Sequence, residues 1–96
     1  MQWINFDKTE SYKKLQEIAK APVDVKTAMA GEGGAERVAK YKVPMSNFLV
    51  YSYAAKQVDD TLLDALQGFA DEAQLTDKYA ALYNGEIINT GEKRRV

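Results

Sequence analysis

The chain has 96 residues, of which 46% are hydrophobic and only two are proline, a composition typical of one small ordered domain. Its formal net charge is −1, and its basic residues are scattered except at residues 93–95, so the charge gives no case for binding nucleic acid. The absence of cysteine and histidine excludes disulfides, thiolate chemistry and imidazole-based catalysis or metal binding.

The first predicted element is a helix over residues 8–20. Asp7, with Glu10 three residues later, is the expected N-cap, and Thr9 is an alternative cap. Pro22 ends the helix because it disfavours helical geometry at the residue before it. The apolar positions at helical spacing are Tyr12, Leu15, Ile18 and Ala19.

A second, shorter helix is predicted over residues 23–30, and the glycine-rich stretch at residues 31–34 is expected to break it. Bare backbone N–H groups before a helix can bind phosphate. Here, however, the spacing matches neither the P-loop nor the dinucleotide motif, and Glu32 would repel an anion. We therefore expect a flexible connector, followed by a third helix over residues 35–40. Residues 1–40 would form a helical arm.

Residues 41–58 are expected to contain a β-hairpin. Two stretches, residues 41–44 and 48–53, are rich in β-branched and aromatic side chains, and Pro44 should keep the first strand short or at an edge. Both faces of the second strand carry apolar bulk, so we expect cover on two sides. A two-stranded ribbon is marginal alone and must pack against the helices.

Residues 59–96 should hold the strongest helix, a shorter helix and a terminal motif. The strong helix begins after Asp59 or Asp60, and Gly68 within it would permit a close neighbour. Thr76 with Asp77 should cap the short helix, which ends at Asn84-Gly85 in the left-handed conformation. The expected core positions are Leu62, Leu63, Leu66, Phe69, Ala70, Ala73, Tyr79, Ala80, Leu82 and Tyr83.

No constellation of reactive side chains emerges from these elements. The adjacent acids Asp59/Asp60 and Asp71/Glu72 are interpreted as caps and solvated surface, because neighbours on a helix point to different sides. Ser46 and Ser52 have no histidine to activate them. We assign no catalytic, substrate-binding, cofactor-binding or metal-binding residue. Arg94 is the one residue that we single out, with an ordinary surface position as the alternative.

The localisation follows from two further features. No apolar run approaches the roughly 20 residues that span a bilayer. Residues 1–7 lack the basic and apolar regions of a secretion signal. We expect a cytoplasmic protein with no membrane partner.

The terminal residues resemble the "NGExIN-x-TExRAVLH" signature of glucose-6-phosphate isomerases. The matching positions, without a gap, are Asn84, Gly85, Glu86, Ile88, Asn89, Glu92, Arg94 and Val96. Residues 48–52 resemble the family's "LLVDYSKN" strand, residues 59–63 its "ITEETL" helix start, and residues 69–75 its "LAKEAGL" segment. Gly91 stands where the family has threonine and Arg95 where it has alanine or methionine, which leaves the subfamily open.

The resemblance implies the N-terminal segment of a larger α/β sugar-isomerase-type enzyme. Such enzymes interconvert glucose 6-phosphate and fructose 6-phosphate, with a carboxylate moving a proton through a cis-enediol, and the family's catalytic groups would lie beyond residue 96. We therefore expect the 96-residue chain to be inactive alone and to need no cofactor. The resemblance also makes Arg94, which matches the terminal motif, a candidate for supporting that distant site. Its partners would be the remainder of the isomerase chain and, only in the full-length enzyme, the sugar phosphate; a homodimer stays open.

The fold expected for residues 1–96 is mainly α, in the α+β class, with four to five helices and one small β-hairpin in a single N-terminal domain or segment. A free-standing helical module that binds another protein is the alternative function.

Overall fold

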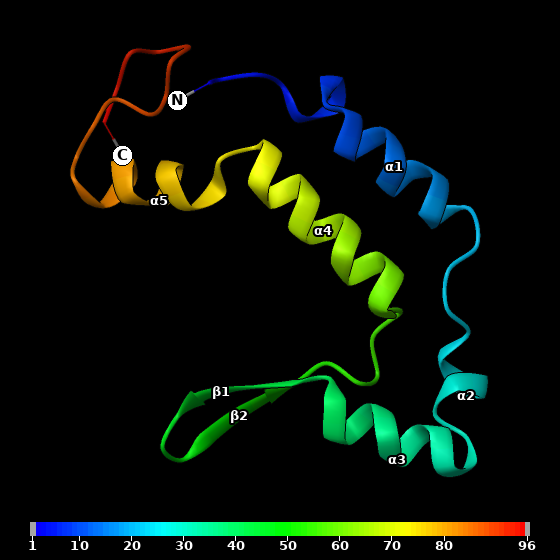
Figure 1. Cartoon of the computed structure of the whole chain (residues 1–96). Coiled ribbons are helices and arrows are strands. Elements are labelled where there is room, and N and C mark those ends of the chain that lie inside the picture. The colour runs from blue at the N-terminus through cyan, green and yellow to red at the C-terminus, as the bar shows by residue number, and fades with distance from the viewer. Residues whose placement is uncertain (1, 96) are drawn as a thin grey trace. The chain divides into compact units, whose positions relative to one another are not determined.

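The computed structural model describes residues 2–95 (Figure 1). They form five α-helices, one 3-10 helix and a two-stranded antiparallel sheet, which confirms the predicted fold class. In chain order the elements are η1 (Phe6–Lys8), α1 (Glu10–Ala19), α2 (Val25–Ala28), α3 (Gly31–Lys40), β1 (Lys42–Ser46), β2 (Leu49–Ser52), α4 (Asp60–Glu72) and α5 (Leu75–Tyr83).

The chain divides into two compact units. The first unit combines the residues up to Ala19 with those from Thr61 onward, and the second comprises Lys20–Asp60. The first therefore holds η1, α1, α5 and nearly all of α4, whereas the second holds α2, α3 and the hairpin.

In the first unit, Thr9 rather than Asp7 caps α1. The Thr9 hydroxyl accepts a hydrogen bond from the Tyr12 N–H at 3.2 Å and donates one to the Phe6 carbonyl at 2.7 Å. Thr9 is buried, whereas Asp7 lies inside η1. The prediction of Asp7 as the cap is wrong, and the alternative cap is confirmed, because the 3-10 turn moves the helix start two residues along the chain.

Helices α1 and α4 lie side by side in the first unit (Figure 1). The Phe6 and Phe69 rings meet edge-to-face with centroids 5.2 Å apart. A Cβ added at Gly68 would lie 4.0 Å from Ser11 Oγ, so the neighbour predicted beside this glycine is present, at ordinary contact distance.

The core of the first unit is made of small residues, not of the predicted leucine and aromatic stripe. Its buried apolar residues are Ala65, Ala73 and Ala81. The prediction of Ala73 as core is confirmed. Among residues 2–95, one predicted core position on α4 and four on α5 are exposed, so their prediction as core is wrong: Leu66, Tyr79, Ala80, Leu82 and Tyr83. Helical spacing identifies a shared face but does not show what covers it.

Helix α5 also begins earlier than expected. It starts at Leu75, after Gln74 in the left-handed region with φ of 54°, so Thr76 is inside the helix and does not cap it. The predicted left-handed end is confirmed at Gly85, whose φ is 74°, but Asn84 keeps a φ of −81°.

In the second unit, the glycine-rich stretch is the first turn of α3 and not a connector. Helix α3 runs from Gly31 to Lys40, and Gly34 is buried. A Cβ at Gly34 would lie 2.1 Å from the carbonyl oxygen of Met29, directly after α2. Close packing of two backbones thus outweighs the low helix propensity of glycine.

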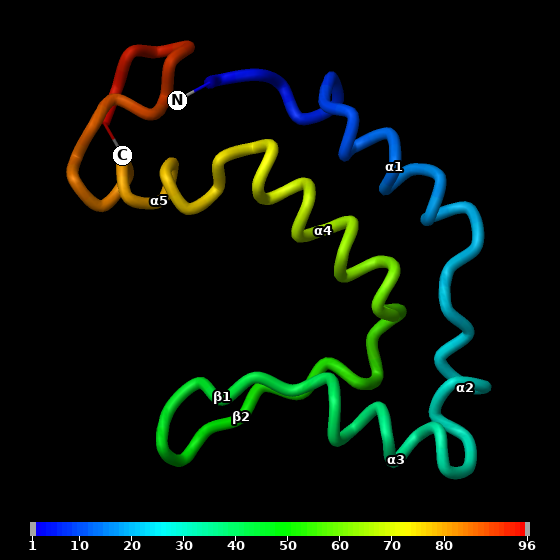
Figure 2. The backbone as a smooth tube through the Cα atoms, viewed as in Figure 1, coloured from blue at the N-terminus to red at the C-terminus, as the bar shows by residue number. Residues whose placement is uncertain are grey.

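The predicted hairpin is confirmed, but its predicted cover is absent from the part of the chain described. Val43 pairs with Tyr51 and Pro44 with Val50, and a bulge interrupts the register between Pro44 and Ser46. Every residue of β1 and β2 is exposed, and the hairpin extends away from α3 (Figure 2). Phe48, at the turn, is 100% exposed.

Candidate functional site

Polar contacts in the second unit centre on Tyr41, which is 5% exposed at the base of the hairpin. The Arg37 guanidinium lies 4.8 Å from the centre of the Tyr41 ring, and Arg37 Nη2 donates to the Ala54 carbonyl at 2.9 Å and to the Lys56 carbonyl at 3.2 Å. One arginine therefore ties α3 to the segment that follows β2.

The start of α4 joins this cluster through Asp60. The Tyr41 hydroxyl donates to Asp60 Oδ1 at 3.1 Å, and the Lys40 ammonium pairs with Asp60 Oδ2. The hydrogen bonds from Lys40 and Tyr41 lower the pKa of Asp60, while burial and then the hydrogen bond to Asp60 raise the pKa of Tyr41. Both shifts favour the charged carboxylate and the neutral phenol, the forms in which the Tyr41 hydroxyl donates to Asp60.

The other acidic pair predicted as surface behaves differently at each position. Asp71 accepts a hydrogen bond from Gln67 one turn earlier on α4. Glu72 instead accepts from the N–H groups of Glu10 and Ser11, at 3.1 and 2.9 Å, and so caps α1 from another helix. Hydrogen bonds from Ser11, first its side chain and then its backbone, lower the pKa of Glu72. Sequence reasoning missed this cap because its partners lie 61 and 62 positions away.

Arg94, the candidate for site support, belongs to a small closed turn. Asn89 and Arg94 form a two-way backbone bridge, and the Glu92 N–H donates to Asn89 Oδ1 at 3.1 Å. The Arg94 guanidinium pairs with the Glu92 carboxylate at 3.1 Å and its side chain is 70% exposed. The matching residues of the terminal motif thus shape a turn that holds a guanidinium outward.

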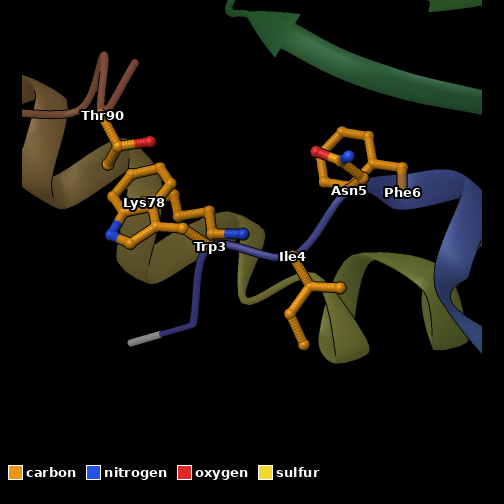
Figure 3. A pocket seen from close by; sticks show the side chains of 6 residues that line it. All are labelled: Trp3, Ile4, Asn5, Phe6, Lys78 and Thr90. Carbon is orange, nitrogen blue, oxygen red and sulfur yellow. The ribbon is translucent and has the colours of Figure 1, made fainter. Parts of the chain in front are cut away.

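A hollow of about 270 Å³ opens in the first unit (Figure 3). The Lys78 ammonium lies 5.1 Å from the centre of the Trp3 ring and 5.6 Å from that of Phe6, so its charge already faces aromatic rings. Both rings are about half exposed. The lining residues are Trp3, Ile4, Asn5, Phe6, Lys78 and Thr90.

The two serines that the sequence analysis set aside, Ser46 and Ser52, both lie in the hairpin. Ser46 Oγ accepts a weak hydrogen bond from the Phe48 N–H at 3.4 Å, and Ser52 lies on an exposed strand. Over the same residues, no group of three or more acids could hold a metal ion. No helix described here has the length and apolar character needed to cross a bilayer.

Exposed apolar surface is the more distinctive feature. On α5 the exposed positions recur at helical spacing, so they form one stripe. We call this the α5 stripe: Leu75, Tyr79, Leu82 and Tyr83. The hairpin is exposed along both strands. Large exposed apolar patches generally mark surfaces of interaction or self-association.

Comparison with known proteins gives one consistent result. The chain is 46% identical over 99 aligned residues to a glucose-6-phosphate isomerase of Treponema denticola, 47% over 96 residues to one of Treponema pallidum, and 36% over 97 residues to one of Borreliella burgdorferi. Each alignment covers 100% of the chain but only 17–19% of the relative. The chain thus spans about a fifth of the length of the curated relatives it matches. No family model and no solved structure matches it.

Proposed function

Because the chain belongs to the glucose-6-phosphate isomerase family, as a homologue of one segment of these enzymes, we propose that it is the N-terminal structural segment of such an isomerase and is not catalytic by itself. The whole enzyme would interconvert glucose 6-phosphate and fructose 6-phosphate in the cytoplasm. Residues 1–96 would then act as one segment that packs on the remainder of the chain.

The observation that carries this proposal is alignment of the whole chain, at 46% identity, with about a fifth of a known isomerase. Both compact units and the terminal turn lie inside the aligned region. The α5 stripe and the exposed hairpin supply apolar surface that a longer polypeptide would cover.

The chemistry of the chain fits a supporting role. Aldose–ketose isomerisation needs a positioned base with a pKa near neutrality. Asp60 and Glu72 instead have lowered pKa values because they accept hydrogen bonds. The groups that move the proton would therefore come from the rest of the isomerase. Arg94 is the residue proposed to brace that distant site.

A chimera tests the proposal. In the Treponema denticola isomerase, the segment that aligns with this chain is replaced by residues 1–96, and conversion of glucose 6-phosphate is measured. We expect kcat/KM within about tenfold of the parent enzyme, a loss of no more than about 1.4 kcal/mol in transition-state stabilisation. The isolated chain should show no turnover above buffer.

Two results would refute the proposal. Turnover by the isolated chain would place catalytic groups within residues 1–96. A chimera that folds but is as inactive as the isomerase with the segment deleted would mean that the chain cannot replace its homologue. A free-standing interaction module would give this second result.

A further inference from the structure

The two edges of the hairpin differ in what they offer to another strand. The Tyr53 N–H donates to the Tyr41 carbonyl at 2.9 Å, so these two residues form a hydrogen-bonded pair. Pro44 and Val50 are paired three positions further along the ladder. Hydrogen-bonded and non-hydrogen-bonded pairs alternate along an antiparallel ladder. Pro44 and Val50 therefore form a non-hydrogen-bonded pair, and their main-chain groups point away from each other toward the two outer edges.

The outer edge of β1 is closed to a further strand. Pro44 has no N–H to donate at that edge, and its ring occupies the space that an approaching strand would need. The bulge between Pro44 and Ser46 breaks the regular spacing of the same edge, and Lys42 places a charge on it. Proline, bulges and lysine are the devices by which proteins prevent unwanted strand pairing.

The outer edge of β2 has none of these devices. By the same alternation, Val50 and Ser52 direct their N–H and carbonyl groups outward. Residues 43–55 contain no charged side chain, and β2 contains no proline. An exposed, uncharged and regular edge of this kind pairs readily with another strand.

One face of the hairpin is apolar and exposed, which is a further reason to expect another strand beside it. Directly paired residues point to the same face, so Val43 and Tyr51 lie together, and Leu49 shares that face two residues along β2. All three side chains are exposed. Two strands alone are marginal in water, and a third strand with an apolar face is what stabilises such a sheet.

We propose that the outer edge of β2 is a strand-addition site, filled in the assembled isomerase by an extended, uncharged stretch of the polypeptide outside residues 1–96. This inference rests on the proposed function. The relatives are about five times longer than the chain, and the alignment with them includes the hairpin. We therefore take the rest of the same polypeptide as the source of the added strand. An uncharged partner fits because β2 offers no charge to pair with.

The chimera with Val50→Pro tests the edge directly. Proline removes one outward N–H but none of the hydrogen bonds within the hairpin, as Pro44 already does across the ribbon. We expect soluble, active chimera to fall by about tenfold or more, the effect of about 1.4 kcal/mol. Val50→Ala, which keeps the N–H, should stay within about threefold of the unsubstituted chimera.

Equal activity and equal thermal stability of the two Val50 variants would overturn the strand-addition site. An inactive unsubstituted chimera would instead refute the proposed function, so the two failures are distinguishable. Sedimentation of the 96-residue chain tests the occupant: a stable dimer that Val50→Pro dissociates would assign the edge to a second copy and overturn the occupant proposed here.

Hydrogen exchange gives a second readout that needs only a folded chimera. In the isolated chain the Val50 and Ser52 amides should exchange freely, whereas the inward amide of Tyr51 is protected. In the chimera the two outward amides should slow by about tenfold or more, because they gain strand partners. Free exchange of both amides in the folded chimera would contradict the inference even where Val50→Pro fails to fold.

Discussion

Replacing glycine with alanine should have opposite effects on stability at two helical positions. Gly34→Ala would place a Cβ 2.1 Å from the Met29 carbonyl oxygen, whereas Gly68→Ala meets nothing closer than Ser11 Oγ at 4.0 Å. We expect the first to destabilise by about 1–3 kcal/mol through overpacking and the second to stabilise by about 0.5–1 kcal/mol through helix propensity. Urea unfolding of both variants measures the free energies, and the same sign for both would contradict this packing.

The Glu72 cap predicts a pH dependence. Its lowered pKa means that the stabilisation is complete above the ordinary glutamate pKa, near 4.3, and is lost as pH falls through the lower folded-state value. Glu72→Gln should therefore lower the unfolding temperature at pH 7, and this effect should shrink as the pH falls below the ordinary glutamate pKa. Glu86→Gln, the same change at an exposed position without a capping contact, serves as control. Equal effects of both substitutions at pH 7 would mean that Glu72 does not stabilise the start of α1.

Arg94 can be tested apart from its own turn. Its side chain is 70% exposed, so Arg94→Met should leave the stability of the isolated chain unchanged within about 0.5 kcal/mol. In the chimera we expect kcat to fall by about tenfold with KM unchanged, as for a group that braces the transition state. Arg95→Met, one residue along at a position that departs from the family pattern, is the matched control. A change in KM alone would assign Arg94 to substrate binding instead.

At the scale of elements, residue patterns predicted where helices and strands lie better than what covers them. The hairpin and the start of the strong helix near Asp60 follow from local composition, and both are confirmed. Gly34 was misjudged because its role depends on the Met29 carbonyl, which no propensity contains. The Glu72 cap depends on contact between α4 and α1, and the exposure of the α5 stripe depends on packing that helical spacing alone does not contain.

The α5 stripe gives the prediction that belongs to this scale. Tyr79 and Tyr83 are 68% and 86% exposed, so their joint replacement by serine should change the stability of the isolated chain by less than about 0.5 kcal/mol. The same double variant should lower the unfolding temperature of the chimera, where we expect the stripe to be covered. Tyr41→Ala, at a buried ring, should cost the isolated chain about 3 kcal/mol and calibrates the measurement. An unchanged chimera would mean that α5 faces water in the whole enzyme.

At the scale of the whole molecule, the polar clusters described above are hydrogen-bonded, whereas many apolar side chains are exposed. Inside the second unit, Arg37 donates to the Ala54 carbonyl and the Tyr41 hydroxyl donates to Asp60. In the first unit, Glu72 accepts hydrogen bonds from N–H groups at the start of α1. The terminal motif identified the family from the residues alone, and the alignments extend that relationship over the whole chain.

The most direct test of this account is complementation in trans. The Treponema denticola isomerase without the segment that aligns with this chain is mixed with residues 1–96 as a separate polypeptide, and glucose 6-phosphate conversion is followed. We predict no activity from either component alone and activity that rises with added chain until the sites are filled. Activity of the segment-deleted enzyme that the added chain leaves unchanged would contradict the structural role assigned to these residues.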